Sequence, residues 1–462
     1  MWGRHVVLAA AIAAAASWGC GDDDDEQPDL AIRAQEVRQL AFDRVVGQVN
    51  LTQQQFEQMV EDEVDQQTDE ELRELADTYG RLGFFDIALD LRPILTSSRV
   101  DSTGAFYSFD TRQITIIGDA EPATVVHEYV HALQDQHFDL AAYDLDTSDG
   151  FLARRAIAEG DAVLAEGRFE VEEQTSGRVG LEGIDLQRWV QGWVSFSEDF
   201  LDDSDYPIVF RAYASFAYAY GLDFSIENLL GVRASPAPAP PHDWTLQDEL
   251  FTTRAPSTTE EVLFGVDTPV AVGIDDVPAG LAARLERLDW DSLGAWYSYL
   301  LVRPYTTTPT TIRAQWDGDR ALFARDRTSG AMGVLWASAW DTETVAAEVA
   351  TVLHSIHDAA GEPLIIERRG VRVVLARNFA AEAGPALVEA AFAGTSKPSP
   401  PRTRPALLAR RREVYSNGCF TSGLAATAAV CAAHEPSTAW VPSSPPCVPM
   451  IHTSSAAMPA PR

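Results

Sequence analysis

The chain has 462 residues, of which 46% are hydrophobic and 23% are charged. This composition supplies enough apolar surface for one large domain or two smaller ones, and it excludes a wholly disordered chain. With 35 basic and 69 acidic residues the formal net charge is −34, and because so acidic a surface repels phosphate backbones, nucleic acid is excluded as a partner.

The first residues predict an export signal. Residues 1–19 place Arg4 before an alanine-rich apolar stretch that is far shorter than the roughly 20 residues needed to span a bilayer. Cys20 and an acidic run follow, which resembles a bacterial lipoprotein signal and implies a lipid on Cys20 and an acidic tether over residues 20–34. We expect a protein of the cell envelope, at the outer membrane or the cell surface, that contacts the membrane through this lipid only; a secreted or periplasmic protein is the alternative.

The next part of the chain predicts helices followed by a hairpin. Residues 35–79 are acidic with apolar residues at helical spacing, which indicates a helical lead-in. Residues 105–109 and 113–117 are β-prone runs separated by a three-residue turn, and they predict a β-hairpin.

Two helices are predicted after the hairpin. The first begins at Pro122, a residue suited to the first helical position, and continues through Leu133 with apolar residues at helical spacing. The second covers residues 151–171. Aromatic-rich helical sequence follows over residues 186–230, and the proline-rich run 235–241 predicts an extended connector.

The remainder predicts a smaller unit and a tail. Expected elements are a helix over 280–301, a turn at Asp317-Gly318, strands at 321–324, 333–337 and 371–375, and a helix beginning near Asp341. The fold class is therefore α+β, with a mainly helical domain over residues 35–234 and a C-terminal α/β subdomain over residues 242–395. Residues 396–462, rich in proline, serine and arginine, predict a disordered tail.

The most informative stretch is Thr124-Val-Val-His-Glu-Tyr-Val-His-Ala-Leu133. Residues four apart lie on the same face of a helix, so His127 and His131 can offer two imidazole nitrogens to one metal ion. Catalytic zinc takes three protein ligands and leaves one position to water, whose pKa it lowers towards 7. Glu128, next to the first histidine, is placed to accept the proton of that water.

Two main candidates compete for the third ligand. Glu159 lies 28 positions after the second histidine, on the next predicted helix, which is the gluzincin arrangement. His137 has the spacing of the third histidine in metzincins, but that pattern requires a glycine where this chain has Gln134. Glu159 is therefore preferred, and Glu166 and Asp161 are further alternatives.

Several motifs together resemble a family of exported bacterial and archaeal proteins of the gluzincin type. They are His-Glu-Tyr-Val-His-Ala-Leu-Gln-Asp-Gln from residue 127, Glu-Gly-Asp-Ala from residue 159, Trp-Asp-Gly-Asp-Arg from residue 316 and Trp-Asp at residue 340. The likeness covers roughly residues 35–385. It implies a zincin-like core with zinc on His127, His131 and Glu159, Glu128 as general base, and the hairpin as the edge strand that pairs with an extended substrate.

A peptidase also needs a donor to the oxyanion that forms during the reaction. Tyr213, Tyr218 and Tyr220 are the candidates, and Tyr218 is preferred because Phe216-x-Tyr218-x-x-Gly221 matches the run in that family. Aromatic core packing is the competing interpretation of these tyrosines.

The leading hypothesis is an exported zinc metallopeptidase that hydrolyses peptide or protein substrates through a zinc-bound water assisted by Glu128. The alternative is a surface binding or structural protein that keeps a zincin scaffold and has no catalytic activity. A third hypothesis is metal-dependent hydrolysis of another bond, such as an amide in cell-wall material.

Overall fold

The computed structural model describes most of the chain between residues 28 and 394. The described ranges are 28–100, 103–140, 145, 147–177, 180, 185–202, 207–230, 244–265, 268–357 and 361–394. The predicted export signal, Cys20, the connector 235–241 and the predicted tail lie outside these residues. Among the helices that the structure describes, none combines the length and the apolar character needed to cross a bilayer.

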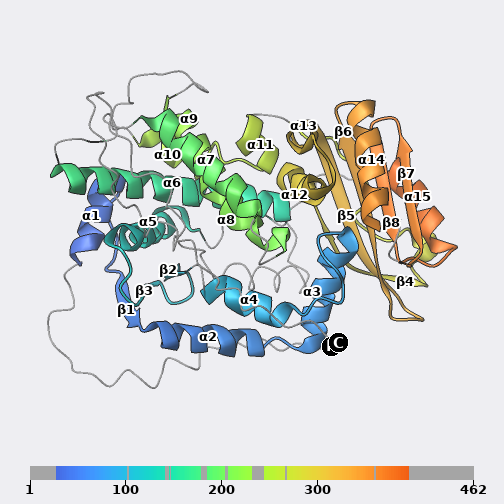
Figure 1. Cartoon of the computed structure of the whole chain (residues 1–462), viewed down its shortest axis with the longest axis horizontal. Helices are drawn as coiled ribbons and strands as arrows, with labels where there is room; N and C mark the ends of the chain where they lie inside the picture. The colour runs from blue at the N-terminus through green and yellow to red at the C-terminus, as the bar shows by residue number, and fades with distance from the viewer. Residues whose placement is uncertain are drawn as a thin grey trace, which may run out of the picture.

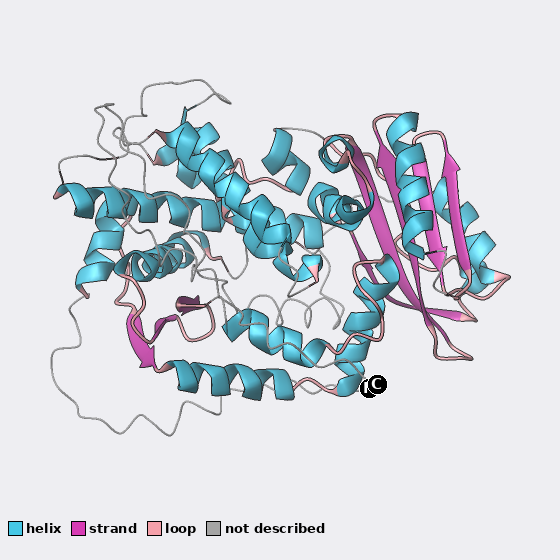
Figure 2. Ribbon diagram, viewed as in Figure 1, coloured by secondary structure: helices cyan, strands magenta, loops and turns pink. Residues whose placement is uncertain are grey.

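The described chain forms a mainly helical body with two sheets (Figures 1 and 2). A small three-stranded sheet lies within the helical part, and a five-stranded sheet forms one end of the molecule. A single hydrophobic cluster extends from Ala31 near the N-terminus to Leu375 in the five-stranded sheet. The mixed, mostly helical architecture agrees with the predicted α+β class.

The N-terminal part contains a strand that the sequence pattern does not predict. Its elements are α1 (Asp29–Arg38), β1 (Gly47–Leu51), α2 (Gln53–Asp65), α3 (Asp69–Leu82) and α4 (Leu91–Val100). Residues 39–51 are not helical, which corrects the helical lead-in predicted for 35–79, and α1 begins inside the predicted tether. Helices α2 and α3 each begin with a threonine capping box, at Thr52 and Thr68, which satisfies backbone N–H groups of the first turn.

The predicted hairpin is present and forms two strands of the smaller sheet. β2 (Ala105–Ser108) pairs antiparallel with β3 (Gln113–Ile117), and β1 pairs with β3 in parallel. β2 is therefore an edge strand and β3 is central. The Ile117 N–H donates to the Gly104 carbonyl at 2.9 Å, and the alternation of antiparallel pairs then turns the Tyr107 N–H toward the free edge.

Two long helices at the centre of the molecule match the predicted pair. α5 (Pro122–Phe138) starts with proline at its first position, where the missing N–H costs no hydrogen bond. α6 (Ser148–Thr175) extends the predicted second helix at both ends. α5 packs against α6, α1 and β2. Because these neighbours cover it, every residue from 123 to 135 is buried.

The aromatic-rich region is divided into several helices. They are α7 (Leu186–Asp202), a 3-10 turn (Ile208–Arg211), α8 (Ala212–Ala217) and α9 (Ala219–Leu230). α9 touches α6 at two glycines: a Cβ on Gly160 would lie 2.1 Å from the carbonyl carbon of Gly221, and one on Gly221 would lie 2.0 Å from the Ala156 oxygen. The missing side chains let the two backbones meet, so α8 and α9 lie close to Glu159.

The segment that follows corrects the helix predicted for residues 280–301. Its elements are α10 (Thr245–Leu250), α11 (Thr259–Phe264), a 3-10 turn (Ala279–Leu281), β4 (Leu285–Asp291), α12 (Gly294–Val302), a 3-10 turn (Arg303–Tyr305) and α13 (Pro309–Arg313). Leu281, Leu285 and Leu288 have helical spacing, but residues 285–291 form a strand because they pair with the neighbouring strand of the larger sheet. α12 packs against α6 and α8, so this region joins the two parts of the molecule.

The larger sheet is entirely antiparallel, with the order β4-β5-β6-β8-β7. Its remaining elements are β5 (Trp316–Asp326), β6 (Met332–Trp340), α14 (Glu343–His357), β7 (Leu364–Arg369), β8 (Arg372–Arg377) and α15 (Ala383–Ala393). The turn predicted at Asp317-Gly318 is instead an irregularity within β5, where Gly318 has a φ of 133°. Residues from α14 and α15 belong to separate hydrophobic clusters that alternate along β6, so the two helices cover opposite faces.

Buried carboxylates connect the start of α6 to the larger sheet. Asp149 accepts hydrogen bonds from the Thr259 backbone N–H at 2.7 Å and from its hydroxyl at 2.6 Å. Asp291 accepts from the Ser148 N–H at 2.7 Å, and Asp319 is buried nearby. Burial raises the pKa of Asp149 to about 7, and the neighbouring acids Asp319 and Asp291 act in the same direction.

Candidate metal centre

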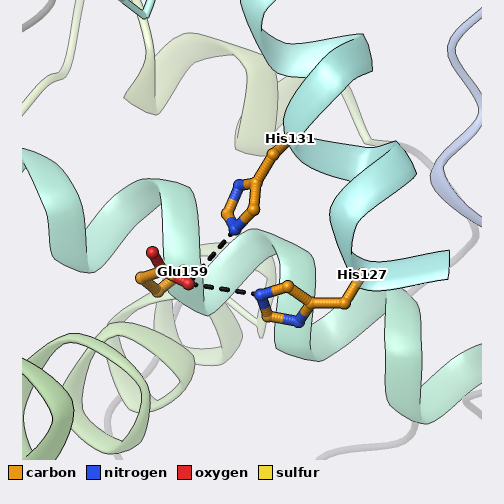
Figure 3. A group of neighbouring side chains, drawn as sticks. All are labelled: His127, His131 and Glu159. Atoms are coloured by element: carbon orange, nitrogen blue, oxygen red, sulfur yellow. Dashed lines mark hydrogen bonds and ion pairs between the residues drawn. The ribbon is translucent and has the colours of Figure 1, made fainter. Parts of the chain in front are cut away.

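The two histidines of α5 lie one helical turn apart on the face that meets α6. The His127 side chain is fully buried and His131 is 1% exposed. Their ring centroids are 4.8 Å apart, and both rings extend from α5 toward α6 (Figure 3). The four-residue spacing that predicts a shared face therefore places two imidazoles at one point inside the molecule.

Glu159 on α6 completes a group of three ligand side chains. Its Oε2 lies 3.2 Å from the Nε2 atom of His127 and 3.2 Å from the Nε2 atom of His131 (Figure 3). One ligand atom from each of the three residues lies within 4.8 Å of the others, so the group could hold a metal ion. Among the described residues this is the group of histidine and carboxylate side chains with that geometry.

The alternative ligands lie elsewhere or have other partners. His137 is exposed, and its Nε2 is 2.7 Å from the Ala41 carbonyl. Asp161 pairs with Arg38, with 2.8 Å between Oδ2 and Nε. Glu166 contacts the far side of the His127 ring, at Nδ1. The metzincin-like arrangement is therefore not formed.

The polar atoms around the triad fit a cation. The Nε2 atom of His131 is buried and makes no hydrogen bond, although the Glu159 carboxylate is beside it. The Oε1 atom of Glu128 is also buried without a hydrogen-bond partner. Buried polar atoms are almost always satisfied in folded proteins. The donor set at this point, two imidazoles and one carboxylate, is a set of ligands that zinc prefers.

Glu128 faces the free edge of β2. Its Oε2 accepts a hydrogen bond of 2.8 Å from the Tyr107 backbone N–H, the group that the strand turns outward. The side chain is fully buried. Burial raises the pKa of Glu128 to about 7, although the two neighbouring imidazoles oppose this shift. A carboxylate in this position can both accept and release a proton near neutral pH.

Each of the three ligand side chains has a supporting hydrogen bond on its outer side. The Nδ1 atom of His127 lies 3.0 Å from the Glu166 carboxylate, and the Nδ1 atom of His131 lies 2.9 Å from the Gln134 amide oxygen. The Tyr213 hydroxyl donates to Oε1 of Glu159 at 2.6 Å. Such outer partners orient metal ligands and select the histidine tautomer.

The sequence predicts other roles for these three supporting residues. Glu166 follows Glu159 by seven positions, two turns of the same helix, and Gln134 follows the second histidine by three. Both spacings place side chains on one helix face, so this signal was available. No local spacing connects Tyr213 with Glu159, because the two residues come from different helices.

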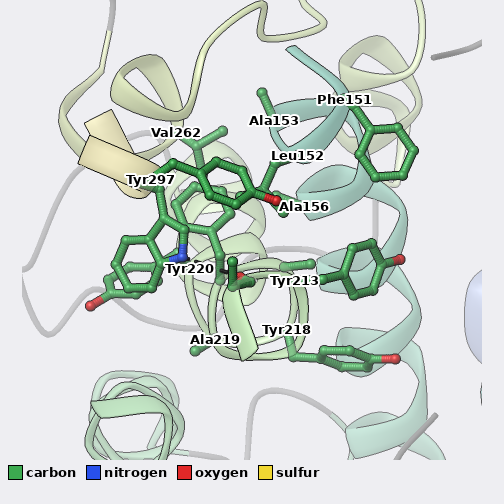
Figure 4. Packing of buried hydrophobic residues seen from close by; sticks show 14 of the residues in the cluster. Phe151, Leu152, Ala153, Ala156, Tyr213, Tyr218, Ala219, Tyr220, Val262 and Tyr297 are labelled. Atoms are coloured by element: carbon green, nitrogen blue, oxygen red, sulfur yellow. Dashed lines mark hydrogen bonds between the residues drawn. The ribbon is translucent and has the colours of Figure 1, made fainter. Parts of the chain in front are cut away.

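The three candidate tyrosines have different surroundings. The Tyr218 ring stacks on the His127 ring with 5.9 Å between centroids, whereas the Tyr220 hydroxyl donates to Glu198 at 2.8 Å, on another side of the helix. Tyr213 and Tyr218 extend in the same direction, alongside the helix that carries Phe151 (Figure 4). Tyr218 thus lies against a metal-ligand candidate, Tyr213 supports one, and Tyr220 does neither.

The electrostatics of the triad favour a positive charge between its side chains. Burial alone would lower the pKa of His127, but its hydrogen bonds to Glu159 and Glu166 raise it well above the usual value. Burial alone would raise the pKa of Glu159, but the two imidazoles hold it well below its usual range. A proton and a metal ion therefore compete for the same atoms, and metal binding weakens as the pH falls.

Comparison with protein-family models, curated proteins and solved structures finds no match for this chain. The chemical interpretation therefore depends on the buried side chains and their geometry. These show a His-His-Glu group that could hold a metal ion, with a second buried glutamate, Glu128, beside it.

Proposed function

We propose that this chain is an exported zinc-dependent peptidase of the gluzincin type. The observation that carries the proposal is the convergence of His127, His131 and Glu159 from two helices, with three ligand atoms within 4.8 Å of one another inside the protein. Glu128 stands next to this group and keeps one carboxylate oxygen without a partner.

Zinc would be held by the Nε2 atoms of both histidines and by Oε2 of Glu159, the three atoms that face one another. When bound, zinc polarises a substrate carbonyl and makes water a better nucleophile at neutral pH. The hydrogen bond from Tyr213 to Oε1 leaves Oε2 as the ligand oxygen.

Glu128 moves the proton in this proposal. Its Oε1 accepts a proton from the attacking water, while the Tyr107 N–H holds Oε2 and fixes the orientation of the carboxylate. After the bond between carbonyl carbon and nitrogen breaks, Glu128 delivers the same proton to the leaving amine. Glu128 must change its protonation state twice in one turnover, and the oxygen that accepts no hydrogen bond is the one available for both transfers.

Tyr218 is the proposed donor to the oxyanion. Its ring stacks on the His127 ring with 5.9 Å between centroids, which places Tyr218 beside one of the proposed zinc ligands. Removing one oxyanion donor typically costs about 10²–10³ in kcat. Tyr218→Phe should lower kcat with little effect on KM, whereas Tyr220→Phe should leave both unchanged.

The test of the proposed function begins with the metal content of the purified protein. Elemental mass spectrometry after dialysis against a weak chelator should find close to one zinc ion per chain. Glu128→Gln should retain that zinc and lose hydrolysis of a peptide library, since glutamine cannot accept the proton. Folded wild-type protein without metal would contradict the metal site, and full turnover by Glu128→Gln would contradict the role of Glu128.

The proposed location in the cell envelope depends on Cys20. Cys20→Ser should abolish incorporation of a labelled fatty acid and release the protein from the membrane fraction. An unchanged membrane fraction would leave the lipid anchor without support, while the metal site would be unaffected.

A further inference from the structure

We propose that Gln134, Asp161 and Arg38 form a positioning relay that fixes which ring nitrogen of His131 faces the metal. The proposal deepens the proposed function, because it requires that the triad binds a metal. Gln134 and Asp161 belong to the sequence motifs described above. In the proposed function they neither bind the metal nor transfer a proton, so their role is otherwise unexplained.

The relay is a continuous series of buried hydrogen bonds. Gln134 lies 2.9 Å from the Nδ1 atom of His131 through its amide oxygen. Its amide nitrogen donates to Oδ2 of Asp161 at 2.7 Å and to the Ala158 carbonyl at 2.9 Å. Arg38 then donates from Nε to the same Asp161 oxygen at 2.8 Å. Gln134, Asp161 and Arg38 are each 0% exposed.

The chemistry of these groups leaves one arrangement of protons. A guanidinium can only donate, so the Asp161 oxygen that Arg38 contacts must be an acceptor. Gln134 faces this oxygen and the Ala158 carbonyl, two acceptors, and must present its NH₂ group to them. Its carbonyl oxygen therefore points at His131 and requires a hydrogen on Nδ1. The Nε2 atom is then the one that can offer a lone pair to the metal.

The ion pair next to Gln134 is fully buried, with both Arg38 and Asp161 at 0% exposure. Arg38 comes from α1, which precedes the first histidine by about 90 positions, and it also pairs with Asp248 of α10 at 2.6 Å. Its guanidinium lies 4.7 Å from the Trp244 ring centroid. A buried ion pair adds little net stability compared with apolar side chains of similar size. Its position directly behind a metal-ligand candidate therefore indicates a positioning role.

The relay also gives a reason for glutamine at the position where a metzincin has glycine. Glycine there would let the chain turn back toward the metal, whereas Gln134 continues the helix and supports the second histidine from one turn away. His127 is supported differently, by the charged carboxylate of Glu166. The two imidazoles thus have unlike partners, one anionic and one neutral.

The first experiment replaces Gln134 with methionine, which has a similar volume but neither the amide donor nor the amide acceptor. Zinc affinity of the full chain is measured by competition with a chromophoric chelator. The expected result is a 10- to 100-fold weaker affinity, the usual range for losing an outer partner of a metal ligand. Gln136→Met is the matched control. Gln136 lies on the same helix, but its amide oxygen accepts from the Asp43 and Arg44 N–H groups, away from the site.

A second variant tests the relay as a unit. Asp161→Asn keeps the size of the side chain but removes the negative charge that fixes the Gln134 amide. The amide can then flip and present its NH₂ group to His131, so this variant should also weaken zinc binding. The double variant Gln134→Met/Asp161→Asn should bind zinc no more weakly than Gln134→Met alone, because both changes interrupt one series. Effects that multiply would indicate two independent structural defects and would overturn the relay.

A spectroscopic measurement on the wild-type protein tests the relay without depending on the folding of any variant. In the zinc-loaded protein labelled with ¹⁵N at histidine, the relay predicts zinc at Nε2 of His131 and a proton at Nδ1; zinc at Nδ1 would overturn it. If the wild type binds zinc but cleaves no peptide, the proposed function fails and the relay is still judged by the affinities. If Gln134→Met binds zinc as tightly as Gln136→Met, the relay fails while the metal site stands.

Discussion

Gly160→Ala is the sharpest test of how the helices hold Glu159. In the interior of a helix, alanine is favoured over glycine by up to about 1 kcal/mol, so propensity alone predicts a more stable protein. The structure predicts the opposite sign. A Cβ at this position would lie 2.1 Å from the carbonyl carbon of Gly221 and 2.7 Å from the Leu222 nitrogen.

The size of the loss in stability depends on which atoms the new Cβ would contact. These are backbone atoms of α9 and cannot turn aside as a flexible side chain could. Ordinary contact requires at least 3.4 Å, so α9 must move away from α6 by more than an ångström. Overpacking a core typically costs about 1–3 kcal/mol, and a clash with a helix backbone belongs at the upper end. After subtraction of the gain in propensity, up to about 1 kcal/mol, we expect the free energy of unfolding to fall by about 2 kcal/mol.

The assay is chemical denaturation followed by circular dichroism, together with the zinc affinity. Gly280→Ala is the control, since a Cβ there meets no atom within 4 Å. Because α9 and α8 move together, Gly160→Ala should also weaken zinc binding through the displaced Tyr213. An unchanged or raised stability would refute the close contact between α6 and α9.

Two further predictions concern the junction and the third ligand. The pKa of Asp149 is about 7 in the folded protein and about 4 in the unfolded chain, so the folded state keeps a proton that the unfolded state has lost, and its stability falls as the pH rises from 4 to 7. Asp149→Asn should therefore reduce the loss of unfolding free energy between pH 5 and pH 8 by up to about 3 kcal/mol, measured by urea denaturation at both pH values; an unchanged loss would show that Asp149 titrates normally. Glu159→Ala should lower zinc occupancy far more than His137→Ala, and the reverse order in elemental analysis would return the site to the metzincin-like arrangement.

The features that could be predicted from the sequence are those encoded within one or two turns of a helix. His127, Glu128 and His131 stand within five residues, so their common face follows from helix geometry alone. Glu159 was preferred because it lies on a second predicted helix, and the structure brings it to both histidines. The hairpin of β2 and β3 was predicted because its two strands are adjacent in the chain.

The features that were missed depend on contacts between distant segments. β1 pairs with β3, more than 60 positions later, and its short sequence has no strong alternation of its own. β4 lies inside the helix predicted over residues 280–301, and its pairing with β5, a contact between distant residues, makes it a strand. The predicted α/β subdomain contains a fully antiparallel sheet. Short turns join β5 to β6 and β7 to β8, whereas helices lie between β4 and β5 and between β6 and β7. Arg38 could not be connected with His131 by any local pattern.

Helix α6 couples the position of Glu159 to the position of the larger sheet. It is continuous over 28 residues, about 42 Å at 1.5 Å per residue. Its first residue is joined to the larger sheet through the Ser148 N–H, which donates to Asp291 of β4 at 2.7 Å, while Glu159 lies about two-fifths of the way along it. Because α6 is one continuous helix, a tilt of the larger sheet would also displace Glu159 relative to the histidines of α5. A fragment that ends before residue 244 would cut this fastening, and the helices that hold the triad should then lose their alignment even though every ligand residue is still present.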